Sequence, residues 1–228
     1  MSSHCIKCLR IHKYCVCNQL PLINSSLNIL IIRHEKESSR PSNTARIAAL
    51  CLSKATIIDF PCDASELHLD PSKDLLIYPV NDDIVPIKTT TRTPKRLVFL
   101  DGTWRQTRKI YKKIEGLQKL PWTILSPSGN PPPKIRKTHF PCGMSTMEAI
   151  GRAIGQFEGE TQEHLLYKGL SLWIDAVRKN TGITLELKSG EDFTDVRRRA
   201  SKLGQDLVEQ SKDKKSNKAS DTVPKISR

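Results

Sequence analysis

Residues 95–113 read KRLVFLDGTWRQTRKIYKK and join an apolar segment, a polar turn and a basic helical pattern. The apolar segment, Leu97–Leu100, is typical of a strand that is covered on both faces of a sheet. The segment after the turn predicts an amphipathic helix, because its apolar positions recur at spacings of three and four: Trp104, Thr107, Ile110, Tyr111 and Ile114. Asp101 therefore stands at the carboxyl end of a strand, where an α/β sheet presents polar groups to a ligand.

The same alternation of strand and helix patterns extends on both sides of this segment. Five apolar runs predict strands at Leu27–His34, Ala55–Phe60, Leu75–Pro79, Arg96–Leu100 and Thr123–Ser126. Helical patterns occupy Asn43–Ser53, Thr103–Ile114 and Ser145–Phe157, and residues 161–188 indicate a further helix followed by a short extended segment. This rhythm predicts an α/β fold with a largely parallel sheet flanked by helices.

Composition divides the chain into three parts. Residues 1–22 form a cysteine-rich head, residues 23–195 the α/β domain, and residues 196–228 a basic tail. Ten basic residues and four acidic residues lie beyond residue 196, and the end of the tail has almost no apolar residues. We therefore expect this tail to be disordered, either as an arm that samples RNA or as a solubilising end.

The charge of the chain favours a polyanionic partner. Lys and Arg outnumber Asp and Glu by 37 to 24, for a formal net charge of +13. Such an excess attracts nucleic acid, although a chain that is simply basic and soluble is the alternative.

We expect no membrane association, because no apolar run is long enough to span a bilayer and no segment combines a basic face with a bulky apolar one. The first residues lack the apolar core of a secretory signal, so we expect a cytoplasmic protein with reduced thiols.

The head carries four closely spaced cysteines in a C-x-x-C…C-x-C pattern: Cys5, Cys8, Cys15 and Cys17. Four thiolates in a segment that is too short to bury a core of its own predict a structural zinc site. His4 or His12 could replace one thiolate. A closed four-ligand site leaves no position for catalysis. Among the remaining cysteines, we expect Cys51 in the core, and neither Cys62 nor Cys142 has an evident base partner for nucleophilic work.

Asp101 has two interpretations from the sequence alone. It can cap the helix that follows, as Asp residues commonly do, while Trp104 packs into the core. Alternatively, Asp101 acts as a general base, with Trp104 as a stacking surface or pocket wall.

Two further polar clusters accompany strand ends or helix starts. In RHEKESSRPSNTAR, residues 33–46, His34 follows the first strand and Asn43-Thr44 opens a helix whose free amides can hold an anion. Ser145 and Glu148 have capping-box spacing at the start of the helix after residue 144, a site that can also bind a carboxylate or a ribose.

A proline-rich loop precedes the second of these helices. It spans residues 126–143 and carries three basic residues: Lys134, Arg136 and Lys137. A stiff basic loop is a candidate contact for a phosphate backbone, and an ordinary surface loop is the alternative. The sequence contains no G-x-G-x-x-G, P-loop, G-x-S-x-G or H-E-x-x-H pattern, which removes most support for a phosphate cradle, a serine hydrolase or a zinc protease.

Taken together, these motifs resemble the DTW-domain family of tRNA-uridine aminocarboxypropyltransferases. The resemblance rests on D-x-T-W at Asp101–Trp104, on the cysteine head, on the H-x-x-E-like and N-T segment, and on S-T-x-E-A from Ser145. It spans about residues 5–185. One departure is that the first cluster reads His34-Glu35-Lys36-Glu37, so either glutamate could fill the acidic position of the family.

The resemblance implies a SPOUT-like fold with a C-terminal knot, and S-adenosylmethionine as the donor of a 3-amino-3-carboxypropyl group. The acceptor would be uridine N3 in tRNA, the product acp3U, and the leaving group methylthioadenosine. The residues that it assigns to the donor are His34, Asn43, Thr44, Leu100, Asp101, Ser145, Thr146 and Glu148. Those that it assigns to catalysis are Asp101, Thr103 and Trp104, and we expect RNA contacts from Arg105, Lys109, Lys134, Arg136 and Lys137.

The expected chemistry explains why a carboxylate is needed. Uridine N3 carries a proton and becomes a good nucleophile only once a base such as Asp101 removes it. N3 also lies on the pairing edge, so the uridine must be unpaired or extruded. Alternatives are a transferase acting on ribosomal RNA, a SPOUT-type RNA methyltransferase, and a non-catalytic zinc-containing RNA-binding protein. The sequence does not indicate the oligomeric state.

Overall fold

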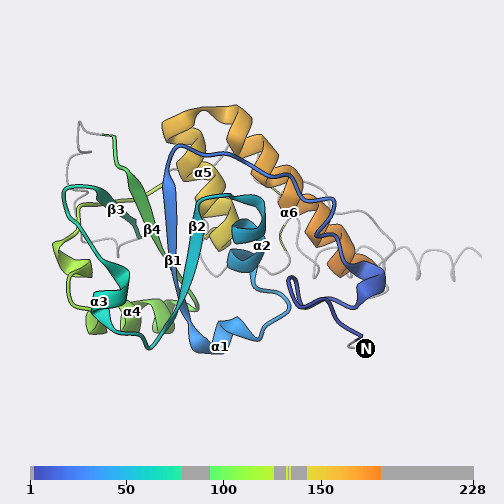
Figure 1. Cartoon of the computed structure of the whole chain (residues 1–228), viewed down its shortest axis with the longest axis horizontal. Coiled ribbons are helices and arrows are strands. Elements are labelled where there is room, and N and C mark those ends of the chain that lie inside the picture. Colours follow the sequence, from blue (N-terminus) through green and yellow to red (C-terminus); the bar gives the residue numbers. More distant parts are fainter. Residues whose placement is uncertain (1–2, 79–92, 126–131, 133, 135–142, 181–228) are drawn as a thin grey trace, which may run out of the picture.

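The computed structural model describes residues 3–78, 93–125, 132, 134 and 143–180 of the chain. Its centre is a five-stranded parallel sheet with the strand order β2-β1-β4-β3-β5 (Figure 1). The strands are β1 (Asn28–His34), β2 (Ala55–Phe60), β3 (Asp74–Ile77), β4 (Arg96–Asp101) and β5 (Trp122–Thr123). The predicted parallel α/β sheet is therefore confirmed.

Helices cover both faces of this sheet. The α-helices are α1 (Glu35–Ser38), α2 (Thr44–Cys51), α3 (Ala64–Leu67), α4 (Trp104–Lys113), α5 (Thr146–Glu158) and α6 (Glu160–Asn180). Two 3-10 turns, η1 (His12–Tyr14) and η2 (Leu117–Lys119), complete the described elements. Figure 1 shows α2, α5 and α6 on one side of the strands and α3 and α4 on the other.

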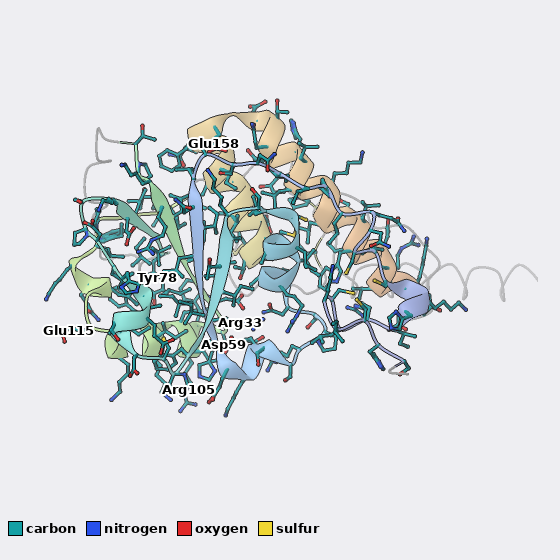
Figure 2. The ribbon with its side chains drawn as sticks, viewed as in Figure 1. Arg33, Asp59, Tyr78, Arg105, Glu115 and Glu158 are labelled. Atoms are coloured by element: carbon teal, nitrogen blue, oxygen red, sulfur yellow. The ribbon has the colours of Figure 1, made fainter. Side chains whose placement is uncertain are left out.

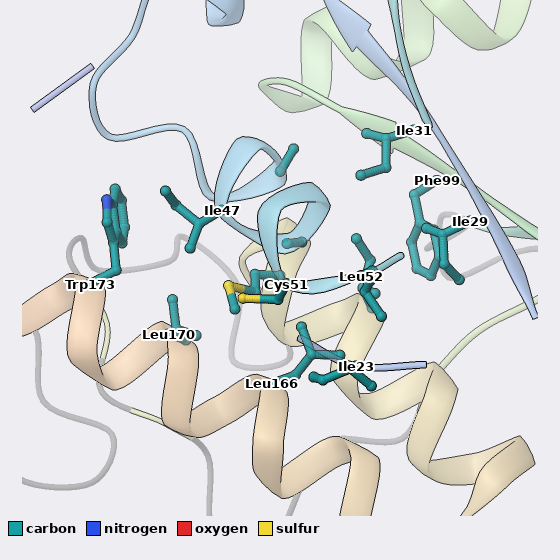
Figure 3. Packing of buried hydrophobic residues seen from close by; sticks show 14 of the residues in the cluster. Ile23, Ile29, Ile31, Ile47, Cys51, Leu52, Phe99, Leu166, Leu170 and Trp173 are labelled. Atoms are coloured by element: carbon teal, nitrogen blue, oxygen red, sulfur yellow. The ribbon is translucent and has the colours of Figure 1, made fainter. Parts of the chain in front are cut away.

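Alternate residues of each strand point to opposite faces, so each strand contributes to two separate cores. On the side of α2, α5 and α6, Ile29, Ile31 and Phe99 pack with helical residues such as Cys51 and Trp173 (Figure 3). On the other side, the even-numbered strand residues pack against α3, α4 and η2; they include Leu30, Ile32, Leu76 and Val98. This double coverage explains why the strands lack a polar alternation.

The predicted strands and long helices agree with the structure to within a few residues. The short helices α1 and α3 were not predicted, because four residues are too few to show a helical period. Cys51 is fully buried, as expected for a core residue. Pro79, Ser126, the extended segment expected after residue 180 and the tail of residues 196–228 lie outside the described residues, as do residues on which the implied knot depends.

The connections between strands create a switch point at the centre of the sheet. From β1 the chain passes to β2 on one side, whereas from β4 it passes to β5 at the far edge on the other side. The carboxyl ends of β1 and β4 are neighbours, with Arg33 opposite Asp101 in the register. Ligands of open α/β sheets bind at this kind of crevice, so the topology directs attention to Asp101.

Within the described part of the chain, none of the helices combines the length and the apolar character that a membrane crossing requires.

Candidate functional site

The carboxylate of Asp101 is held by two elements that are distant in sequence. The Asn43 side-chain amide donates a hydrogen bond to one oxygen at 2.6 Å, and the Thr146 hydroxyl donates to the other oxygen. Asn43 is the N-cap of α2 and Thr146 is the first residue of α5. The end of β4 and the N-termini of two helices therefore converge on one carboxylate.

Asp101 is not the cap of the helix that follows it. Thr103 is the N-cap of α4, and its hydroxyl accepts a hydrogen bond from the Gln106 amide while the Gln106 side chain accepts from the Thr103 amide. The interpretation of Asp101 as a simple helix cap is thus wrong. Its side chain points instead to the side of the sheet covered by α2 and α5.

The surroundings of Asp101 act on its charge in opposite directions. The side chain is buried, with 5% of the residue exposed, and burial raises the pKa of the Asp101 carboxyl above its usual range. The hydrogen bonds from Thr146 and Asn43 and the charge of Arg33 oppose this shift. The positive ends of the α2 and α5 helix dipoles favour the carboxylate as well. A buried carboxylate with a raised pKa is a suitable proton acceptor.

The start of α5 forms the predicted capping box. Ser145 accepts a hydrogen bond from the Glu148 amide at 3.3 Å, and the Glu148 carboxylate accepts from the Ser145 amide at 3.2 Å. Burial raises the pKa of Glu148, and the charge of Lys134 opposes that shift. Lys134 itself donates to the Gly143 carbonyl oxygen at 2.7 Å, so it lies beside this helix start.

The end of β1 leads into a compact polar turn. His34 is the N-cap of α1, where its Nδ1 accepts from the Lys36 amide at 3.3 Å, and its ring lies 6.1 Å from that of Phe60. Of the two glutamates that could fill the acidic position, Glu37 is buried and paired with Arg40 at 3.1 Å, whereas Glu35 is exposed. The fold thus encloses Glu37 and leaves Glu35 at the surface.

Not every predicted site residue gathers around Asp101. Asn43 and Thr146 contact it directly, and Thr44, Ser145 and Glu148 lie next to these two in sequence. The other predicted residues lie toward the α4 side of the sheet: His34 packs on Phe60 of that core, Leu100 packs in the same core, and Thr103 and Trp104 begin α4.

The predicted RNA contacts fall into two groups. Arg105 (Figure 2) and Lys109 are exposed on α4. This helix also carries Arg108, Lys112 and Lys113 and no acidic residue. Lys134 lies beside α5, and Arg136 and Lys137 lie outside the described residues. The outer surface of α4 is thus a continuous basic strip.

A half-buried ion pair beside Asp101 was not predicted from the sequence. Arg33, aligned with Asp101 in the sheet, donates two hydrogen bonds to the Asp59 carboxylate, at 2.7 and 2.9 Å (Figure 2). An arginine near the end of an otherwise apolar strand is the signal that could have revealed it, because a buried guanidinium requires a partner.

The head brings its four cysteines together. The sulfur atoms of Cys5, Cys8, Cys15 and Cys17 all lie within 4.8 Å of one another, and the Cys5–Cys17 and Cys8–Cys15 pairs are 3.8 Å apart. Tetrahedral zinc, about 2.3 Å from each thiolate, would place the sulfurs about 3.8 Å apart. The residues therefore fit the ion. His4 and His12 are exposed and outside this cluster.

The surroundings of the head act differently on the individual thiols, because burial raises the pKa of Cys8 and of Cys17. The backbone amide of Cys8 lowers the pKa of the Cys5 thiol to about 6. Leu9 adopts a left-handed conformation with φ 59°, which closes the turn that presents Cys5 and Cys8. Cys5, Cys8 and Val16 belong to the same apolar cluster as Trp173 of α6, so the head packs directly onto the sheet domain.

A groove of about 470 Å³ lies at the opposite end of the strands. Its lining includes Lys54, Lys95 and Arg96, but Arg96 is engaged in an ion pair with the buried Asp74. The groove is formed at the amino ends of the strands, away from the switch point where ligands of α/β sheets bind. We therefore assign the functional site to the Asp101 cluster and not to this groove.

Comparisons with known proteins identify the family of the chain. A family model described as the DTW domain matches residues 2–179. The chain is 28% identical over 171 residues to a protein named tRNA-uridine aminocarboxypropyltransferase 2 from Drosophila melanogaster, covering 69% of this chain and 68% of that protein. It is also 28% identical over 130 residues to the protein of the same name from Mus musculus, covering 51% of this chain and 43% of that protein. No solved structure matches the chain significantly.

The matched residues include the cysteine head, and they also include Asn43, Asp101 and Thr146, which hydrogen bonds bring together. Because it covers most of the chain, the protein belongs to the DTW-domain family.

Proposed function

We propose that this protein transfers the 3-amino-3-carboxypropyl group of S-adenosylmethionine to N3 of a uridine in tRNA. The names of the Drosophila and mouse relatives support the reaction class and the substrate. The observation that carries the proposal is the meeting of Asn43, Asp101 and Thr146 at the switch point of the sheet.

The proposed roles follow from the contacts of each side chain. The sulfonium donor supplies an electrophilic γ-carbon with methylthioadenosine as a neutral leaving group. Asp101 accepts the N3 proton, the new N3–Cγ bond forms, and the electron pair of the broken Cγ–S bond leaves with sulfur. Each Asp101 oxygen accepts one hydrogen bond in the described structure and keeps a second lone pair for the proton.

The helix starts that surround Asp101 are suited to orient the donor. Asn43 and Ser145 cap α2 and α5, and the free amides of such helix starts can bind polar groups of a ligand. Orientation of two bound substrates supplies much of the rate in a transfer with a good leaving group.

The basic strip of α4 is proposed to bind the tRNA backbone. Arg105 and Lys109 extend from the helix that starts two residues beyond Asp101, so RNA bound there would lie close to the site. Trp104, at the first position of α4, is the proposed stacking surface for the extruded uridine.

Zinc in the head is proposed as a structural ion, since four thiolates complete a tetrahedral shell. Thiols that serve as metal ligands must remain reduced, which is consistent with a cytoplasmic location.

Mass spectrometry of tRNA nucleosides tests the proposal. We expect the purified protein, incubated with unmodified tRNA and S-adenosylmethionine, to produce acp3U and methylthioadenosine in equal amounts. Asp101→Asn should keep the fold and lose transfer, because Thr146 can turn its hydroxyl to accept from the new amide while Asn43 still donates to the remaining oxygen.

Other outcomes would identify a different function. Methylated uridine with S-adenosylhomocysteine would indicate a methyltransferase, and product on ribosomal RNA alone would change the substrate. Binding of tRNA without turnover of the donor would indicate a non-catalytic module. As the matched control, Arg96→Gln at the opposite end of β4 should leave transfer unchanged.

A further inference from the structure

Arg33 carries a buried hydrogen-bond donor for which the described part of the chain offers no partner. Its Nε and Nη2 atoms are bound to Asp59, and its side chain is only 8% exposed. The third nitrogen, Nη1, is inaccessible to solvent and has no hydrogen-bond partner among the described residues. Buried donors are nearly always satisfied in folded proteins, and an exception needs an explanation such as a ligand.

A second arginine with the same property lies close by. Arg46 is in the first turn of α2, where its Nη2 donates to the Ser38 carbonyl oxygen while its buried Nε has no partner among the described residues. Burial, and then the positive charge of Arg33, lower the pKa of the Arg46 guanidinium. The two guanidinium groups are thus near enough to repel each other.

The position of this pair relates it to the proposed active site. In the sheet, Arg33 stands between Asp59 on β2 and Asp101 on β4. Arg46 belongs to the same helical turn as Asn43, since its amide donates to the Asn43 side chain at 3.0 Å. Figure 2 shows Arg33 and Asp59 together at the carboxyl end of the strands.

We propose that Arg33, together with Arg46, binds the α-carboxylate of the methionine part of S-adenosylmethionine. This inference rests on the proposed function and deepens it by assigning the anchor of the transferred group. Guanidinium groups bind carboxylates through paired hydrogen bonds. The carboxylate of Asp59, beside Arg33, provides the opposite charge that the α-ammonium group requires.

Burial distinguishes this ligand from an RNA phosphate. A phosphate of a folded tRNA would have to reach a side chain that is 8% exposed, whereas the exposed arginine and lysine residues of α4 are open to it. We expect the smaller carboxylate of the donor to reach Arg33 when the donor binds. Anchoring the carboxylate would also fix the chain of the donor so that its γ-carbon, and not its methyl group, meets the acceptor.

Donor analogues without the carboxylate provide the test. We expect calorimetry on the full chain to show that the wild-type protein binds S-adenosylmethionine at least tenfold more tightly than decarboxylated S-adenosylmethionine, which keeps the sulfonium and the adenosine. Arg33→Gln should abolish most of this preference and leave the affinity for methylthioadenosine unchanged. Asp59 is 42% exposed, so its carboxylate can be solvated once Arg33 is replaced.

Arg96→Gln is the matched control. Arg96 also forms a paired interaction with an aspartate, but this aspartate, Asp74, is buried and the pair lies at the amino end of β4. This variant should keep the preference for the carboxylate. Arg46→Gln should reduce the preference in the same direction as Arg33→Gln, which keeps the test decisive if the Arg33 variant fails to fold.

The results separate the two proposals. The carboxylate-binding role of Arg33 would be wrong if the wild-type protein bound S-adenosylmethionine and its decarboxylated analogue equally well. It would also be wrong if Arg33→Gln kept the preference for S-adenosylmethionine. Neither result would contradict the transferase proposal. Weaker tRNA binding by Arg33→Gln with an unchanged preference would assign Arg33 to RNA instead. If the wild-type protein binds neither S-adenosylmethionine nor methylthioadenosine, both proposals fail together.

Discussion

At the scale of single residues, Asp101 combines proximity to two donors with an unfavourable environment for its charge. Its carboxylate is 5% exposed, and the Asn43 amide and the Thr146 hydroxyl only partly offset the cost of burying it. Sites that hold a charge against desolvation commonly lower stability in favour of chemistry. This balance leads to a prediction about pH.

Replacing Asp101 with Asn should raise the melting temperature at neutral pH. Because burial raises the pKa of Asp101 in the folded protein, the folded state binds the proton more tightly than the unfolded chain does. The stabilisation by that proton is complete below the ordinary pKa of an aspartate, about 4, and is lost as pH rises through the raised pKa. The advantage of the variant in thermal unfolding should therefore shrink from pH 7 toward pH 4. An advantage that grows on acidification would contradict this account.

Thr146→Val tests the second donor without changing the shape of the side chain. The variant leaves one buried oxygen of Asp101 without its hydroxyl donor, and we expect a loss of about 1–3 kcal/mol in the free energy of unfolding in urea. Thr146→Ser keeps the hydroxyl and should lose much less. A valine variant as stable as the wild-type protein would contradict a contribution of the hydroxyl to stability.

At the scale of elements, one face of α4 packs on the sheet and the other carries the proposed RNA-binding residues. Ile110 is buried against the sheet, whereas Arg105, Arg108, Lys109, Lys112 and Lys113 are exposed. The helix begins at Trp104, the last residue of the D-x-T-W element, and Thr103 is its N-cap. The proposed RNA-binding surface is therefore joined to the proposed base, Asp101, by a short capped segment.

Neutralising two of these charges should change how salt weakens tRNA binding. The logarithm of the association constant for tRNA decreases linearly with the logarithm of the salt concentration, and each phosphate contact adds about one to the steepness of this line. For the double variant Arg105→Gln and Lys109→Gln, we therefore expect the line to be less steep by about two. Titrations between low and physiological salt would measure this. Lys119→Gln on η2, an exposed lysine paired with Glu115, is the control and should leave the slope unchanged.

The sequence predicted these elements well where a residue pattern reports on burial. The apolar run at Leu97–Leu100 and the spacing of three and four through Ile110 indicated a covered strand and its helix. The partners of Asp101 could not be predicted, because Asn43 and Thr146 are 58 and 45 residues away and only the topology of the sheet joins them. The Arg33–Asp59 pair was missed for the same reason.

At the scale of the whole molecule, the head and the sheet domain share one apolar cluster. Cys5 and Cys8 pack in the same cluster as Trp173, and Arg10 lies 5.4 Å from the Trp173 ring while donating to the Pro41 carbonyl oxygen at 3.1 Å. The metal site is thus connected to the segment that leads to Asn43.

Removing the metal should therefore destabilise the entire protein. We expect Cys15→Ser, or a strong chelator, to remove one zinc ion per chain and to lower stability by about 3 kcal/mol, roughly 6–12 °C in melting temperature. Metal analysis and thermal unfolding of the same samples would measure both. Cys62→Ser, outside the cluster, should change neither quantity. A wild-type protein that is metal-free and equally stable would contradict the structural role.

The convergence of three distant segments on Asp101 has a consequence for synthesis of the protein. Asn43 and Asp101 leave the ribosome well before Thr146, which is residue 146 of 228. A growing chain that already contains the sheet still lacks the second donor to the carboxylate. The nascent protein must therefore reach the start of α5 before both donors to Asp101 are present.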